Sequence, residues 1–230
     1  MATSENKARA LRGELYYAFT PELIAERRRC SRACERYNNA GEVSRRARVE
    51  LWRDVVGDST PLAPLATTEE EDEALFAEDP WVCPPINMDY GTNLILGDNV
   101  FINFGASIID TCNISIGART LLACNVSLFS GTHPLDPEVR NGTKGPEMGK
   151  EIVIEADCWL GGNVTVWPGI TIGRGSTDGA GSVVTKDVAR YTVVAGNPAR
   201  KIRDVPRGTK EEVTSGALAV LEKDGAGKAY

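Results

Sequence analysis

The sequence lacks the hydrophobic segments that mark membrane and secreted proteins. Its 230 residues contain no apolar run near the roughly 20 residues that a membrane-spanning helix needs. The first residues, MATSENKARALRGELYY, contain no apolar core of the kind found in secretory signal peptides. These absences predict a cytoplasmic protein, and the length suits one large domain or a core domain with a smaller attachment.

Excess positive charge and soft metal ligands are also missing. The chain has 26 Lys and Arg against 32 Asp and Glu, a net charge of −6, so DNA and RNA are not expected partners. It has one histidine and no CxxC pair, and we therefore expect no metal cofactor. The six cysteines occupy helical, loop and repeat positions rather than a disulfide framework: Cys30, Cys34, Cys83, Cys112, Cys124 and Cys158.

The first third of the chain has helical periodicity. Apolar residues in PELIAERRRCSRACERYN recur near a spacing of 3.6 with arginines on the other side, and Thr20-Pro21 is a typical helix start. A second helix is predicted over Val43–Val56. The acidic stretch TTEEEDEALFAED is either a short third helix or a solvated run of charge. We interpret residues 1–80 as a helical cap.

A six-residue repeat replaces this pattern from Leu94 onward. Aliphatic residues return every sixth position, with a slip between Ile108 and Ile116 and an interruption between Leu128 and Ile154. This spacing fits neither an amphipathic helix nor an alternating strand; it is typical of a coil whose stacked walls bury one apolar column. We predict a mainly β domain over residues 81–203. Residues 204–230 form a tail in which residues 211–221 are a candidate short helix.

Several segments resemble one family of enzymes. PPINMDYGTNLILGDNVFINFGASIID, GTHPLDPEVRNG, CWLGGNVTVWPGITIG, GAGSVVTKDV and AGNPARKIR resemble the hexapeptide-repeat sugar O-acetyltransferases of the maltose, galactoside and nodulation type. GELYYAFTPELIAERRR extends the match into the helical cap of that family. The resemblance implies a left-handed parallel β-helix, acetyl-CoA as the donor, and a homotrimer with active sites in the clefts between subunits.

The interruption of the repeat contains the single histidine, His133. About residues 129–152 are extruded from an otherwise regular wall, and loops on rigid scaffolds concentrate function. Attack of a hydroxyl on a thioester needs a base, and a histidine near its ordinary pKa of about 6.5 suits that task. The resemblance gives His133 this role. No residue resembles an acyl-enzyme nucleophile, so we expect direct attack in a ternary complex.

The resemblance also implies residues that bind the acceptor. Asn103 matches a contact asparagine, although asparagines also cap β-helix corners. Asp110 can orient the imidazole, contact the acceptor or hydrogen-bond a corner, and Arg27 can equally be a solvated charge within RRR. Tyr90 and Glu147 match an entry position and a loop position of the family.

Coenzyme A requires a narrow slot for its pantetheine arm and positive charge for its phosphates. Small residues at Gly161-Gly162 and Gly179–Ser182 suit the slot, and basic residues near the end of the repeat suit the phosphates. Trp159 either flanks the thioester or packs between subunits. The resemblance implies that the donor-binding residues are Trp159, Gly162, Ala180, Thr185, Lys186, Arg200 and Arg203.

Three residues depart from the family pattern. Thr20 stands where sugar-acetylating relatives usually have Asp, and Thr111 where some have a second acidic residue, so the acceptor is open. Asp178 stands where the family has an inward Ile, and we expect a partner or a local distortion there, because an unpaired buried carboxylate is unfavourable.

The sequence therefore predicts an acetyl-CoA-dependent O-acetyltransferase for a small hydroxylated acceptor, a sugar or glycoside first. A non-sugar hydroxyl, in a secondary metabolite or xenobiotic, is the alternative acceptor. A non-catalytic structural trimer is the alternative of another class.

Overall fold

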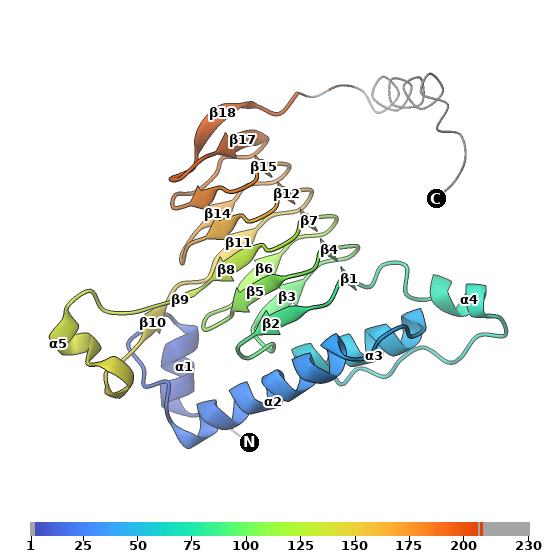
Figure 1. Ribbon diagram of the computed structural model, residues 1–230, viewed down its shortest axis with the longest axis horizontal. Coiled ribbons are helices and arrows are strands. Elements are labelled where there is room, and N and C mark those ends of the chain that lie inside the picture. The colour runs from blue at the N-terminus through green and yellow to red at the C-terminus, as the bar shows by residue number, and fades with distance from the viewer. Residues whose placement is uncertain (1–2, 207, 209–230) are drawn as a thin grey trace.

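The computed structural model describes residues 3–206 and 208, and it shows a stack of short strands standing on a layer of helices (Figure 1). The helices are α1 (Glu5–Leu11), α2 (Pro21–Asn38), α3 (Arg45–Val56) and α4 (Glu69–Ala74). In Figure 1, α2 and α3 run under the first coil, and α1 lies beside the extruded loop. Within these described residues, no helix has the length and apolar character that crossing a membrane requires.

Side-chain caps decide where the helices begin. The Ser44 hydroxyl accepts a hydrogen bond from the backbone of Ala47, so α3 starts two residues later than predicted, and it ends at Gly57 in the left-handed conformation. The acidic stretch is a helix, because Thr68 and Glu71 form a capping box at the start of α4. The predicted cap residue Thr20 precedes α2, but its side chain makes no capping hydrogen bond.

The strands form three walls, which we call sheets 1, 2 and 3. Each coil contributes one strand to each sheet in turn, and neighbouring coils pair in parallel with matched aliphatic residues. Sheet 1 contains β1 (Trp81–Val82), β4 (Phe101–Ile102), β7 (Leu121–Leu122), β12 (Trp159–Leu160), β15 (Thr177–Asp178), β17 (Thr192–Ala195) and β18 (Arg200–Asp204). Sheet 2 contains β2 (Ile86–Met88), β5 (Ala106–Ile109), β8 (Ser127–Phe129), β13 (Thr165–Val166) and β16 (Val183–Val184). Sheet 3 contains β3 (Leu94–Leu96), β6 (Ile114–Ile116), β11 (Ile152–Ile154) and β14 (Thr171–Ile172).

The predicted hexad residues point into the stack and form its core. Ile102, Leu122 and Leu160 follow one another up sheet 1 and are fully buried. Ile108, Leu128 and Val166 do the same on sheet 2, as do Ile154 and Ile172 on sheet 3. Burial of each such side chain contributes about 1.5–3 kcal/mol, so the repeat itself stabilises the coil.

Asp178 continues the sheet 1 column in place of an aliphatic residue. It is fully buried, it pairs in register with Leu160 and Val194, and neither carboxylate oxygen has a hydrogen-bond partner among the described residues. The expectation of a partner is therefore wrong, whereas β17 has a register shift against β18 between Val193 and Val194, next to the position opposite Asp178. Burial raises the pKa of Asp178 to about 7, which favours the neutral acid in this apolar column.

Both ends of the stack are covered. At the first coil, the Tyr37 hydroxyl donates to the Val82 carbonyl, and the Asn38 amide bonds both the N–H and the C=O of Ile86 at 2.9 Å. At the last coil, β18 pairs antiparallel with β17, and Val188 bridges to Ile172 of β14. The predicted helix in residues 211–221 lies outside the described residues.

Candidate active site

The strands of sheets 2 and 3 are joined by three enlarged turns that stack on one edge, which we call the loop corner. They are residues 89–93 in the first coil, residues 110–113 in the second, and the extruded loop of residues 130–151 in the third. The slip in the hexads between Ile108 and Ile116 is thus the second of these turns. The loop is therefore the largest member of a stacked set.

A short hairpin holds the base of the extruded loop. β9 (Gly131–Thr132) and β10 (Met148–Gly149) pair antiparallel, with Thr132 opposite Met148. The next residues outward are His133 and Glu147, so the hairpin register brings these two positions together. His133 is exposed, and beyond it the loop contains α5 (Pro137–Arg140) and a 3-10 turn (Gly142–Lys144).

The N-terminal arm connects to this hairpin. Tyr16 and Glu147 exchange two backbone hydrogen bonds of 3.0 and 2.9 Å, and the Tyr16 hydroxyl donates to Glu147 Oε2 at 3.0 Å. The arm packs against α2, where Arg27 donates to the Tyr90 hydroxyl at 2.6 Å and to the Ala18 carbonyl at 2.7 Å. Three of the predicted acceptor residues, Arg27, Tyr90 and Glu147, therefore belong to one cluster beside the loop base.

Two further residues of this cluster escaped the sequence analysis. Tyr16 is buried and bonds Glu147, and Asp89 immediately precedes Tyr90 in the first enlarged turn. Burial raises the pKa of Asp89, while the positive charge of Arg27 opposes that rise. Burial also raises the pKa of Tyr90. For Asp89 the available signal was the hexad slip, which marks the same corner one coil later; for Tyr16 the sequence offered no such signal.

Asp110 holds the first enlarged turn in place. It is fully buried, and its two carboxylate oxygens accept hydrogen bonds from the backbone N–H groups of Tyr90 and Asn93, at 2.8 and 3.3 Å. The Asn93 amide returns a bond of 2.7 Å to the Asp110 carbonyl. Burial raises the pKa of Asp110 to about 6, and the two backbone donors act in the opposite direction. The sequence left three roles open for Asp110: orienting the imidazole, contacting the acceptor or hydrogen-bonding a corner of the coil. Its bonds to the backbone of Tyr90 and Asn93 are of the third kind.

The two departures at the acceptor end lie near this cluster. The Thr20 hydroxyl is buried and has no hydrogen-bond partner in the described part of the chain. Thr111 is buried and packs against Gly131 at the base of the loop.

The opposite edge of sheet 2, which we call the small-residue corner, contains Asn103. Its backbone N–H bonds the Leu122 carbonyl, and its side chain accepts from the N–H of Phe104 at 2.8 Å. In successive coils the same corner continues with small residues whose backbones follow the strands of sheet 1. They are Ala123, Gly161, Gly162, Gly179, Ala180, Ala195 and Gly196. Asn103 and His133 therefore lie on opposite edges of sheet 2.

The predicted donor residues are also divided. Gly162 and Ala180 lie on the small-residue corner, and Trp159 is 54% exposed on sheet 1 beside it. Thr185 and Lys186 follow β16 on the loop corner, whereas Arg200 and Arg203 belong to β18. Lys186 and Arg200 line one hollow of about 270 Å³ at the end of the stack.

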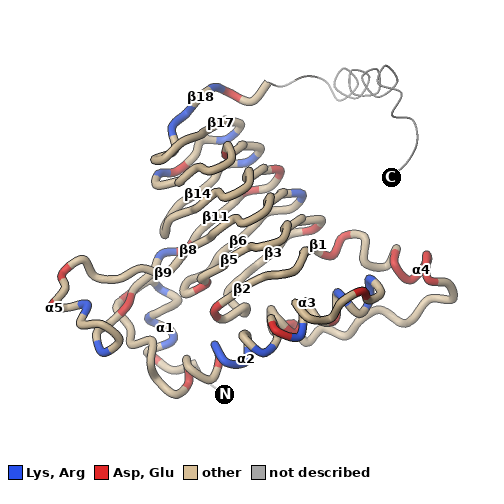
Figure 2. Tube along the Cα trace, in the orientation of Figure 1, with Lys and Arg blue, Asp and Glu red and all other residues tan. Residues whose placement is uncertain are grey.

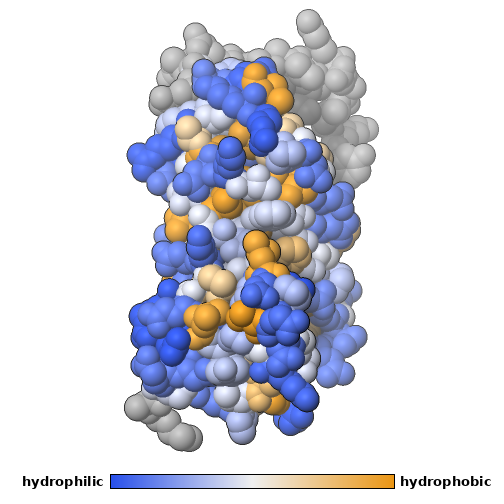
Figure 3. All heavy atoms as spheres, turned by 90° about the vertical axis from the view of Figure 1, so that its left-hand side faces the viewer, coloured by the Kyte–Doolittle hydropathy of each residue, from blue (hydrophilic) through white to orange (hydrophobic). Residues whose placement is uncertain are grey.

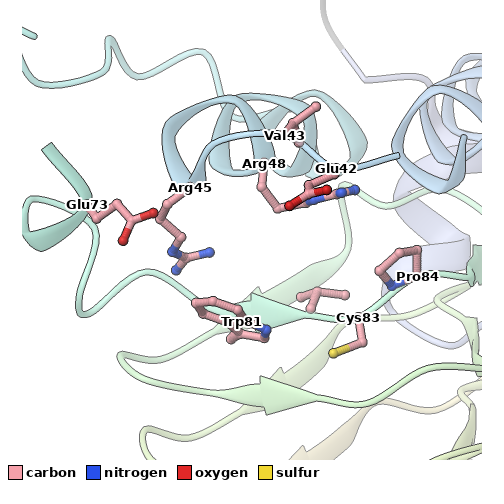
Figure 4. A pocket seen from close by; sticks show the side chains of 9 residues that line it. Glu42, Val43, Arg45, Arg48, Glu73, Trp81, Cys83 and Pro84 are labelled. Atoms are coloured by element: carbon pink, nitrogen blue, oxygen red, sulfur yellow. The ribbon is translucent and has the colours of Figure 1, made fainter. Parts of the chain in front are cut away.

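Figure 3 looks at the side that carries α1 and α5, and it shows hydrophobic side chains scattered among hydrophilic ones. A separate pocket of about 300 Å³ lies at the first coil, under α3, where Arg45 stacks on Trp81 (Figure 4). None of the predicted site residues lines that pocket, and the guanidinium of Arg45 donates to three backbone carbonyls. In the described residues, no group of three His, Cys, Asp or Glu side chains is placed to hold a metal ion.

Two family models match the chain. The maltose acetyltransferase hexapeptide capping motif matches residues 9–60, and the hexapeptide repeat of succinyl-transferase matches residues 151–186. The chain is also 40% identical over 132 residues to the galactoside O-acetyltransferase of Escherichia coli K12, a match that covers 57% of this chain and 64% of that protein.

The fold matches the crystal structure of a maltose O-acetyltransferase from Clostridium difficile 630, with a TM-score of 0.76 and 34% identity over 90% of this chain and 100% of that one. The chain belongs to the maltose and galactoside O-acetyltransferase family. A hexapeptide-repeat acetyltransferase from Vibrio cholerae, crystallised with acetyl-CoA, matches with a TM-score of 0.71 and 29% identity. The match covers 89% of this chain and 100% of that one.

Membership of this family confirms three of the predictions from the sequence. The fold is the hexapeptide-repeat β-helix with an N-terminal helical cap, the activity is acetyl transfer, and the donor is acetyl-CoA.

Proposed function

We propose that this acetyltransferase moves the acetyl group to a hydroxyl of a small sugar or glycoside, with His133 as the general base. The observation that carries the proposal is the cluster at the loop corner. The hairpin of the loop presents an exposed imidazole beside Glu147, and the same corner holds Arg27 and Tyr90. A ring of charged and hydroxyl-bearing side chains of this kind suits a polyhydroxylated acceptor, because each can bond a hydroxyl group.

The reaction requires the removal of one proton and the stabilisation of one oxyanion. The acceptor hydroxyl attacks the thioester carbonyl while its proton passes to the His133 imidazole, and collapse of the tetrahedral intermediate releases the coenzyme A thiolate. The imidazolium then protonates that thiolate, so the base is regenerated within one turnover. Backbone N–H groups would stabilise the oxyanion. Four of the six cysteines, Cys30, Cys34, Cys112 and Cys158, are buried in the coil or in α2 against it, and none of the six is needed as a nucleophile.

A second copy of the chain would complete the site. Asn103, Gly162 and Ala180 lie on the small-residue corner, but His133 lies on the loop corner across sheet 2. If the loop corner of one copy faces the small-residue corner of another, donor, acceptor and base converge in the cleft between them. This arrangement supports the homotrimer that the family resemblance implies.

Replacement of His133 by Ala tests the mechanism. We expect kcat to fall by about 10²–10⁴, the usual contribution of a general base, while the affinity for coenzyme A stays unchanged. Thiol release from acetyl-CoA measures the first quantity, and calorimetry with coenzyme A measures the second. Turnover within a few-fold of the unaltered protein would refute His133 as the base.

A panel of sugars, glycosides and non-sugar alcohols, assayed by the same thiol release, tests the acceptor. We expect sugars or glycosides to give the highest kcat/KM. A non-sugar hydroxyl at the top of the panel would favour the alternative acceptor. This alternative is kept open by the buried Thr20 hydroxyl, which has no hydrogen-bond partner within the described part of the chain. A structural trimer without catalysis predicts no heat of binding with coenzyme A.

A further inference from the structure

A hollow on the outer face of α2 is lined almost entirely by arginine. Its volume is about 430 Å³, and its lining consists of Ala25, Arg28, Arg29, Arg32 and Arg36, so none of the described residues that form it is acidic. Figure 2 shows the blue of Lys and Arg along α2, in a chain whose net charge is −6. The positive charge is therefore a local feature of this helix.

The spacing of these arginines places like charges next to one another. Arg28, Arg32 and Arg36 are four residues apart, so they project from one side of the helix and span about 12 Å along its axis. Like charges at this spacing repel and destabilise a helix. An anion bound across the row would relieve that repulsion.

Two of the four guanidinium groups are held rigidly. Arg29 donates to the carbonyls of Asp54, Val55 and Tyr90 at 2.6, 2.9 and 2.6 Å. The first two carbonyls lie in the last turn of α3, so the partial negative charge of that helix end offsets only part of the charge of Arg29. Arg36 donates to the carboxylate of Asp54, which is the one acidic group that the hollow's arginines contact among the described residues. The contacts to α3 fix one wall of the hollow in advance of binding.

The other two guanidinium groups are available. Arg28 and Arg32 are exposed, and neither has a hydrogen bond or ion pair to any residue that the structure describes. Each can present a planar pair of N–H donors, a geometry that matches two oxygens of a phosphate group. The four arginines of the hollow therefore have only the Asp54 carboxylate as a counter-charge among the described residues, and the N–H donors of Arg28 and Arg32 are unused.

We infer that this hollow binds an anion with two or more phosphate groups, at a site separate from the acetyl-CoA site. Two groups are specified because the available arginines, Arg28 and Arg32, lie about 6 Å apart along the helix, so each can bind one phosphate group of a diphosphate. The site is separate because α2 lies under the first coil, whereas β18, which contains Arg200 and Arg203, lies at the other end of the stack (Figure 1).

Titration with inorganic pyrophosphate, in the presence of saturating coenzyme A, tests the inference. We expect calorimetry to show one site per chain, and the midpoint of thermal unfolding to rise with pyrophosphate concentration. Affinity should fall as sodium chloride is raised, because exposed charges are screened. The double variant Arg28→Gln/Arg32→Gln should bind at least about tenfold more weakly, since two charge-assisted contacts are removed.

The matched control is Arg12→Gln/Lys144→Gln, which removes two positive charges elsewhere on the surface. It should bind pyrophosphate like the unaltered chain, and circular dichroism should show the same helix content in both double variants. Unchanged affinity in Arg28→Gln/Arg32→Gln, or an equal loss in the control, would overturn the site. Weaker coenzyme A binding in Arg28→Gln/Arg32→Gln would overturn its separation from the donor site. The proposed acetyl transfer is unaffected by either result.

Discussion

Asp178 is a carboxyl group inside a column of aliphatic side chains, with Leu160 on one side and Val194 on the other. Burial raises its pKa from 3.8 to about 7, and neither carboxylate oxygen has a hydrogen-bond partner among the residues that the structure describes. In the unfolded chain the same group titrates near its ordinary pKa of about 3.9. One residue therefore makes the stability of the last coils depend on pH.

The replacement Asp178→Asn should remove this dependence. Below about pH 4 the carboxyl is neutral in both states, and between about pH 4 and 7 only the unfolded state releases the proton. The unaltered protein therefore loses up to about 4 kcal/mol of stability over that range, and loses no more above it. Denaturant unfolding at pH 5 and pH 8 measures the difference between the two proteins.

Asp98→Asn is the matched control, since Asp98 is exposed on a turn. Its stability should follow that of the unaltered protein at both pH values. If Asp178→Asn shows the same loss between pH 5 and 8 as the unaltered protein, the carboxyl is not the titrating group. Asp178→Ile should stabilise the protein at pH 8, because it replaces a charged group with an aliphatic one.

At the scale of elements, the loop corner is an assembly of three turns in which each is held by a residue of the next. Asp110 of the second turn accepts from the backbone of the first, at Tyr90 and Asn93. Ser130 of the third turn bonds the N–H and C=O of Cys112 in the second turn, and it also donates to the carbonyl of Ile109 at the end of β5. The position of Tyr90 and its partner Arg27 thus depends on the hydrogen bonds of the next coil.

The replacement Asp110→Asn should weaken this corner. An amide has one acceptor oxygen for two backbone donors, and the buried donor that loses its partner costs about 1–3 kcal/mol. We expect a lower midpoint of thermal unfolding and, because Tyr90 moves, a higher KM for the acceptor with little change in the KM for acetyl-CoA. Steady-state kinetics with each substrate varied in turn separates the two effects.

Ser130→Ala supplies the comparison for Asp110→Asn. It also removes buried hydrogen bonds at the loop corner, but it holds the second turn and not the turn of Tyr90. A similar rise in acceptor KM for both variants would mean that general loosening, rather than the position of Tyr90, controls acceptor binding.

The hexads could be predicted from the sequence because each strand and turn together take six residues, so an inward aliphatic side chain recurs at every sixth position. The loop was visible for the same reason, as a break in that repeat. Tyr16 and Glu147 are 131 positions apart, and no periodicity connects them, so their contact required the folded chain. The role of Asp110 could not be predicted for the same reason. Its three possible roles differ only in which groups lie near the carboxylate, and the sequence does not give those neighbours.

At the scale of the molecule, sheet 1 presents a column of exposed apolar side chains. Trp81, Phe101, Leu121 and Trp159 lie in register on successive coils, and Trp81, Leu121 and Trp159 are 56, 47 and 54% exposed. A continuous apolar column of this kind favours contact with another copy. It lies beside the small-residue corner, which the proposed inter-subunit site uses.

Leu121→Glu should therefore disrupt self-association. We expect the unaltered protein to have a mass near three times the 24.8 kDa of one chain by light scattering, and the variant to shift toward the monomer with loss of activity. Leu65→Glu is the control, because Leu65 is 77% exposed in the segment between α3 and α4. A trimeric and active Leu121→Glu protein would contradict the proposed interface.

The covers at the two ends of the stack have a further consequence. A coil of parallel strands can in principle continue at either end. The backbone N–H and C=O groups of its first and last strands are free to pair with a strand of another chain. Asn38 occupies the bonds of Ile86 at one end, and β18 occupies those of β17 at the other. These contacts remove groups to which a second molecule could add end to end, so we expect their loss to lower solubility.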